Sequence, residues 1–151
     1  MRCVITLASD GSVAVADNGR GTATGHDADG RPVRKPIMAT RDLRFFDHPD
    51  AQRLPDGHPR RGMSIVAALS QWLIHTNRRR DGAWTQRYEH GIPVTGLLPL
   101  PPAATTGTTV HFLPADEVSP TPGLSPESLR RLAAAWPHLH VDIVDERNRG
   151  R

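Results

Sequence analysis

The sequence VAVADNGRG, residues 13–21, joins an alternating strand to an acidic turn that glycines flank. Residues 4–8 alternate in the same way, and Asp10-Gly11 between the two runs is typical of a tight hairpin. The pattern therefore predicts two paired strands, with Asp17 placed where the second strand ends.

The turn after this strand has the residue types that suit a loop binding a purine. A carboxylate at Asp17 can accept a hydrogen bond from an exocyclic amine such as that of adenine. Gly19 and Gly21 let the backbone approach a base because they carry no Cβ. The alternative is an ordinary turn that ends a strand, which the same residues also favour.

Beyond this turn, further segments in a fixed order resemble the N-terminal ATPase domain of the gyrase B subunit of bacterial type II topoisomerases. That domain belongs to the GHKL family and has a Bergerat-type fold. The resembling segments are residues 13–21, 62–70, 79–91 and 106–114, followed by a closing helix and strand at 129–147. The resemblance implies an α/β two-layer sandwich, with helices on one face of a mixed, mainly antiparallel sheet. Residues 1–147 would form one such domain, and 148–151 a polar tail.

The same resemblance implies roles for individual residues. Asp17 would bind the adenine amino group, Gly21 would line the base, and Thr108 would support it with a hydroxyl. Arg20 and Arg80 resemble the residues at the mouth of the family's pocket, where aminocoumarin inhibitors also bind. For Arg80 the alternative is a solvated arginine run, because residues 78–80 are all arginine.

The helix that carries the family's catalytic Glu and magnesium-binding Asn should precede Val4, and residues 1–3 are too short to hold it. General-base help is typically worth about 10²–10⁴-fold in rate. Losing the Asn would remove the metal's protein ligand. We therefore expect no catalytic residue and no metal ligand in this chain, and no hydrolysis of ATP by this chain alone.

The phosphate-binding lid also departs from the family. Where the family has a GGLHGVG run, residues 56–62 read DGHPRRG. Pro59 has no N–H to offer a phosphate, and Arg60 replaces a glycine needed for close approach. Gly57 and Gly62 remain as candidates on the phosphate side. Arg60 and its neighbour Arg61 could contact phosphates through their guanidinium groups, or could merely occupy a lid that no longer works.

Several other elements can be predicted. Residues 63–75 are expected to form a helix, and 35–44 a shorter one. Ser125-Pro126 is typical of a helix start, with a Ser N-cap and Pro in the first turn, and predicts a helix of about ten residues. Prolines prevent a regular central strand until Thr108. Residues 138–144 alternate as a final strand.

Composition limits the function classes. The 151 residues carry a net charge of +3, with arginines interspersed among acids and Lys35 as the only lysine. DNA binding through phosphates needs a clustered basic stripe, so direct DNA binding is not expected. No apolar run approaches the roughly 20 residues of a membrane span, so we expect no membrane association and a cytoplasmic location. The eight histidines show no paired metal-ligand spacing.

Two functions from different classes remain open. In the first, the chain keeps a pocket for ATP or ADP and works with a protein partner that completes a topoisomerase-type enzyme. In the second, it is a non-enzymatic protein that binds an aminocoumarin-like antibiotic for self-protection, or that interacts with a topoisomerase.

Overall fold

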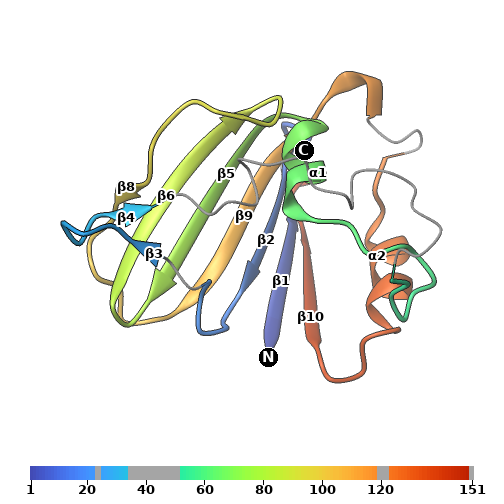
Figure 1. Ribbon diagram of the computed structural model, residues 1–151. Helices are drawn as coiled ribbons and strands as arrows, with labels where there is room; N and C mark the ends of the chain where they lie inside the picture. The colour runs from blue at the N-terminus through green and yellow to red at the C-terminus, as the bar shows by residue number, and fades with distance from the viewer. Residues whose placement is uncertain (23–24, 34–51, 119–122, 150–151) are drawn as a thin grey trace.

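One large sheet organises the protein (Figure 1). The computed structural model describes residues 1–22, 25–33, 52–118 and 123–149. Within them the strand order is β10-β1-β2-β9-β5-β6-β7, and β8 also pairs with β6. The strands are β1 (Arg2–Leu7), β2 (Val13–Asp17), β5 (Ser70–Arg79), β6 (Gly82–Glu89), β7 (Ile92–Pro93), β8 (Leu98–Pro99), β9 (Gly107–Pro114) and β10 (His140–Asp145). All neighbouring strands are antiparallel except β1 and β10, which run parallel.

Helices form the second layer of the fold. The described residues contain α1 (Met63–Ala68), α2 (Pro126–Ala133) and a 3₁₀ turn at Asp116–Val118. Helix α1 contacts β5 and β6, whereas α2 contacts the edge strand β10 (Figure 1). A small separate hairpin pairs β3 (Gly25–His26) with β4 (Pro32–Val33). The predicted α/β two-layer sandwich with a mixed, mainly antiparallel sheet is confirmed.

The core lies between α1 and the middle of the sheet. Leu73 of β5 is 0% exposed and packs with Tyr88 of β6, Val110 of β9 and Ala67 of α1. Alternation along each strand places every second residue on this helix-covered face. The same face of β9 therefore includes Thr108, two residues before Val110.

The helix predicted for residues 63–75 ends earlier than expected, at Ala68. The hydroxyl of Ser70 donates to the carbonyl of Val66 (2.5 Å), and the N–H of Ala115 donates to the carbonyl of Leu69 (2.9 Å). From Ser70 onward the backbone instead pairs with β9 on one side and β6 on the other. Tertiary pairing thus overrides the local helical pattern. The alternation of large or β-branched residues at Trp72, Ile74 and Thr76 was the overlooked strand signal.

Other predicted elements are confirmed with small shifts. Strands β1 and β2 form the expected hairpin. Helix α2 begins at the predicted Ser125 cap, where the Ser125 hydroxyl accepts from the N–H of Ser128 (3.0 Å), and it is eight residues long. The final strand begins at His140, two residues later than expected. The helix predicted at 35–44 lies outside the described residues.

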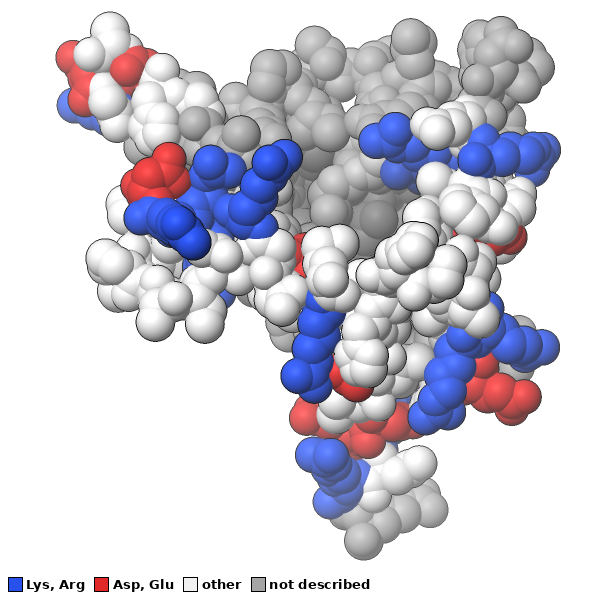
Figure 2. All heavy atoms as spheres, turned by 90° about the horizontal axis from the view of Figure 1, so that it is seen from below, with Lys and Arg blue, Asp and Glu red and all other residues white. Residues whose placement is uncertain are grey.

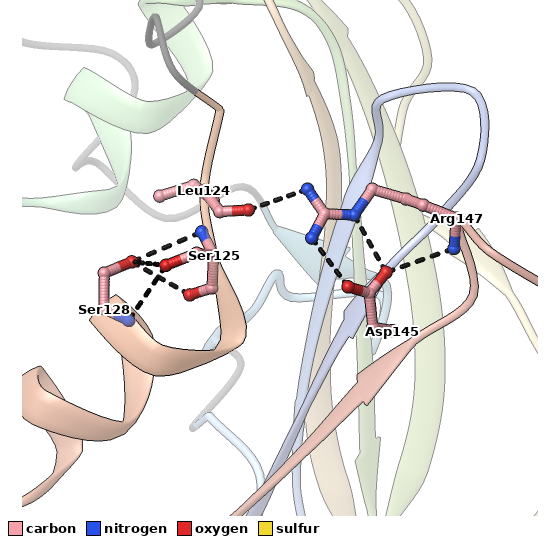
Figure 3. A network of polar contacts seen from close by, with 5 residues as sticks. All are labelled: Leu124, Ser125, Ser128, Asp145 and Arg147. Atoms are coloured by element: carbon pink, nitrogen blue, oxygen red, sulfur yellow. Dashed lines mark hydrogen bonds and ion pairs between the residues drawn. The ribbon is translucent and has the colours of Figure 1, made fainter.

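A bidentate ion pair ties the end of β10 to the segment that leads into α2 (Figure 3). Arg147 donates from Nε and Nη2 to the two carboxylate oxygens of Asp145 (2.8 and 2.7 Å). Its Nη1 donates to the carbonyl of Leu124 (2.7 Å). The Arg147 guanidinium holds the pKa of Asp145 at about 2, below its ordinary value of 3.8.

We expect Arg147→Gln to return the pKa of Asp145 toward its ordinary value of 3.8, because the carboxylate loses its charged donor. In the wild type the pKa is lowered on folding. The pair therefore stabilises the fold above about pH 4, and this contribution is lost as the pH falls through about 2. Carboxyl ¹³C NMR titration measures this directly. The matched control is Arg149→Gln, whose side chain makes no ion pair in the described part of the chain. An unchanged titration of Asp145 in Arg147→Gln would contradict the assignment.

Candidate functional site

The carboxylate of Asp17 is held in place at the end of β2 by backbone donors. Its Oδ1 accepts from the N–H of Gly19 (2.8 Å) and, across the sheet, from the N–H of Thr108 on β9 (3.3 Å). Within the described residues, Oδ2 accepts no hydrogen bond and the carboxylate has no ion pair. The geometry thus leaves one oriented acceptor for a donor outside these residues.

Thr108 lies beside this carboxylate because β2 and β9 approach closely. Ala16 pairs with Thr109, which places Asp17 opposite Thr108. Gly107 has φ +151°, and a Cβ there would overlap the carbonyl oxygen of Asp17. The Thr108 hydroxyl has no hydrogen bond to any described residue. The structure therefore brings together Asp17 and Thr108, the two residues that the resemblance assigns to one base.

The second half of the turn lies across the end of β5. Gly21 has φ +79°, and a Cβ there would stand 2.6 Å from the carbonyl oxygen of Arg78. The next residue, Thr22, is bound by Asn77, whose Oδ1 accepts from the Thr22 N–H (2.7 Å) and whose Nδ2 donates to the Thr22 carbonyl (3.0 Å). Sequence reasoning missed Asn77. The available signal was its position four residues after Leu73, on the inward face of the strand.

Arginines surround this end of the sheet. Arg20 and Arg80 are exposed and make no ion pair within the described residues. Arg79 contacts the turn instead, since its Nη1 donates to the carbonyl of Gly21 (3.3 Å) while its Nε pairs with Asp81 (3.1 Å). Viewed toward this end, the basic side chains stand in separate groups with acidic ones beside them (Figure 2). Roles for Arg20 and Arg80 at the pocket mouth stay predictions.

The predicted phosphate segment folds on itself. Residues 52–60 form a small loop in which the N–H groups of Leu54, Gly57 and Arg60 donate to the carbonyls of His58, Leu54 and Gln52. The N–H of His58 donates to the Asp56 carboxylate (3.0 Å). Gly57 lies in this loop, and the buried Gly62 is the residue before α1. In the described residues neither glycine forms a hydrogen bond with the Asp17 turn.

Asp17 has the thiol of Cys3 as its neighbour on β1. Cys3 pairs with Asp17 in the β1–β2 ladder and is buried. Burial, and secondarily the negative charge of Asp17, raise the pKa of the Cys3 thiol above its ordinary value. The thiol therefore stays neutral at physiological pH.

Metal-binding clusters and membrane-spanning helices are both missing from the described part of the chain. No group of three or more His, Cys, Asp or Glu side chains within residues 1–22, 25–33, 52–118 and 123–149 could hold a metal ion. In the same residues, no helix is long and apolar enough to cross a membrane.

No protein-family model matches the chain. Among curated proteins, it is 31% identical to the DNA topoisomerase 4 B subunit of Bacillus subtilis over 150 residues, which is 96% of this chain and 23% of that protein. The DNA gyrase B subunit of Thermotoga maritima is 33% identical over 149 residues, which is 95% of this chain and 23% of that protein. The DNA gyrase B subunit of Haloferax volcanii is 35% identical over 154 residues, which cover 95% of this chain and 24% of that protein. The chain spans about a quarter of the length of these relatives. On this similarity, the chain belongs to the family of gyrase B and topoisomerase IV B subunits, and it matches one segment of those proteins.

Proposed function

We propose that the chain binds the base of an adenine nucleotide at Asp17 and does not hydrolyse ATP by itself. The observation that carries this proposal is the carboxylate with one oxygen held by two backbone N–H groups and the other left as an acceptor. An exocyclic amine can donate to that second oxygen, Oδ2. The neighbouring Thr108 hydroxyl can donate or accept, so it can bind a ring nitrogen or a bridging water.

The lack of hydrolysis follows from what surrounds this site. In the described residues, no glutamate lies on β2, on the Asp17 turn, or on the strands β5 and β9 that the turn contacts. A general base must stand within hydrogen-bond reach of the attacking water. We infer that a base and a magnesium ligand would come from another protein segment, which makes a topoisomerase-type partner part of this proposal.

A second candidate function is supported by the loop at residues 52–60. The N–H groups of Leu54, Gly57, His58 and Arg60 are engaged within the loop, and Pro55 and Pro59 have none, so these six residues offer no N–H group to a phosphate in this conformation. A ligand without phosphates, such as an aminocoumarin, would need only the Asp17 end. The chain would then be an antibiotic-binding, self-protecting or topoisomerase-interacting protein.

We expect ADP, or a non-hydrolysable ATP analogue with magnesium, to raise the thermal unfolding midpoint of the wild type, and Asp17→Asn to lose this effect. In Asp17→Asn the amide oxygen can still accept from Gly19 and Thr108. Its NH₂ group replaces the free acceptor with a donor, which an amine cannot satisfy. A hydrogen bond to a charged group is worth about 1.5–3 kcal/mol, so ligand affinity should fall roughly 10- to 100-fold.

The matched control is Asp10→Asn, because Asp10 accepts from the N–H of Ser12 (2.8 Å) in the same way but lies at the other end of β2. It should leave ligand binding unchanged. Inosine triphosphate has an oxo group in place of the amine, so it should bind Asp17→Asn better than ATP does. If only an aminocoumarin stabilises the wild type, the second candidate is favoured. Absence of any Asp17-dependent shift with these ligands would refute both.

A further inference from the structure

Asn77 is a buried polar residue that the proposed ligand contacts do not use. Its side chain is 0% exposed, and it pairs with Thr108 on β9 and Trp84 on β6 in the middle of the sheet. An amide buried there is costly unless its polar groups are hydrogen-bonded. Both the oxygen and the nitrogen of the Asn77 amide form hydrogen bonds, and both bonds are with one residue of a different segment.

That residue is Thr22, directly after the Asp17 turn. The amide accepts from the Thr22 N–H (2.7 Å) and donates to the Thr22 carbonyl (3.0 Å). It therefore binds the backbone of Thr22 with the same pair of hydrogen bonds that a residue of a neighbouring antiparallel strand would form. Thr22 and Asn77 are 55 residues apart in the chain, and the contact brings the exit of the turn to the end of β5. Gly21 lies so close to this strand end that a Cβ would meet the Arg78 carbonyl at 2.6 Å.

The turn is therefore tied down at two places. At its start, Asp17 Oδ1 is held by Gly19 and by Thr108 of β9. At its end, Thr22 is held by Asn77 of β5, which is the direct neighbour of Thr108. The backbone of Gly21 lies between these two ties and is also bound by Arg79 (3.3 Å).

We propose that Asn77 is a positioning residue for the base-binding site, because its amide fixes the backbone of Thr22 at the exit of the turn that begins at Asp17. This inference rests on the proposed function. Asn77 itself does not touch the base. It sets the distance between the Gly21 backbone and the Asp17 carboxylate, so freeing Thr22 would widen the site without changing the group that recognises the amine.

The test compares Asn77→Leu with Gln86→Leu. Both replace a buried amide with an apolar side chain of similar size, and among the residues that the structure describes, Gln86 bonds only the Thr95 carbonyl and the Tyr88 hydroxyl, away from the turn. We expect Asn77→Leu to weaken ADP binding about tenfold by calorimetry, and to speed hydrogen exchange of the Thr22 amide in NMR. Gln86→Leu should do neither. If Asn77→Leu does not fold, Asn77→Asp keeps the volume and the acceptor for the Thr22 N–H, replaces the donor to the Thr22 carbonyl with an acidic oxygen, and should still weaken ADP binding.

Unchanged ADP affinity together with faster Thr22 exchange in Asn77→Leu would overturn the positioning role and leave a purely structural tie. An equal loss of affinity in Gln86→Leu would overturn it as well, since the effect would then be general. Failure of the proposed function is recognised separately, because the wild type would bind no ADP while its Thr22 amide stayed protected from exchange.

Discussion

Gly107→Ala is expected to destabilise the protein by about 4 kcal/mol, the largest effect that we expect from adding a single methyl group. Two costs combine at this position. The backbone has φ +151°, which L-residues rarely adopt, and the new Cβ would overlap the carbonyl oxygen of Asp17. To relieve the overlap, β2 and β9 must separate at the end where Thr108 donates to Asp17. The loss of unfolding free energy is measured by urea unfolding, with tryptophan fluorescence as the signal.

Gly82→Ala separates the two costs. Gly82 has nearly the same backbone angle, φ +155°, but nothing lies within 4 Å of the Cβ that it would acquire. The unfolding free energy of Gly82→Ala should fall only by the cost of the backbone conformation, about 1–2 kcal/mol. Equal losses in the two variants would show that the strands yield without penalty at Gly107, and would contradict the close approach of β9 to the Asp17 turn.

Leu73→Ala should cost about 3 kcal/mol of unfolding free energy, because it leaves a cavity where β5, β6, β9 and α1 meet. Leu73 is 0% exposed and packs against Ala67, Tyr88 and Val110. The small helix α1 has six residues, so it cannot close over the missing volume easily. The change is measured from the urea midpoint at constant m-value.

Leu132→Ala on α2 is the comparison, since Leu132 is 42% exposed. The unfolding free energy should fall by less than about 1 kcal/mol in Leu132→Ala, because the Leu132 side chain buries little apolar area. A loss at Leu73 no larger than at Leu132 would mean that the centre of the sheet does not form the core described above.

The family resemblance rests on short local motifs, and it predicted the fold class correctly. It also assigned Asp17 and Thr108 to one site, and the structure places these two residues side by side. From the arginine run it singled out Arg80 for the pocket mouth, which stays a prediction, and it did not single out Arg79, whose Nη1 donates to the Gly21 carbonyl. Identical neighbours carry no local signal that separates them. Only the alternation of β5 decides which arginine of the run points toward the turn.

By itself, the sequence determined those features whose partners lie within a few residues. The β1–β2 hairpin, the acidic turn at Asp17 and the Ser125 cap of α2 are all of this kind, because a turn or cap is satisfied by neighbouring backbone groups. Side-chain chemistry at Asp17 could be inferred for the same reason.

Tertiary structure alone decided the rest. Ser70–Arg79 is a strand because β6 and β9 supply its hydrogen bonds, and β1 pairs in parallel with β10 from the far end of the chain. Asn77 acquires its role only when Thr22 is brought against it. In each case the stabilising partner is distant in sequence, so the local pattern can indicate a strand or a buried position but cannot identify the partner.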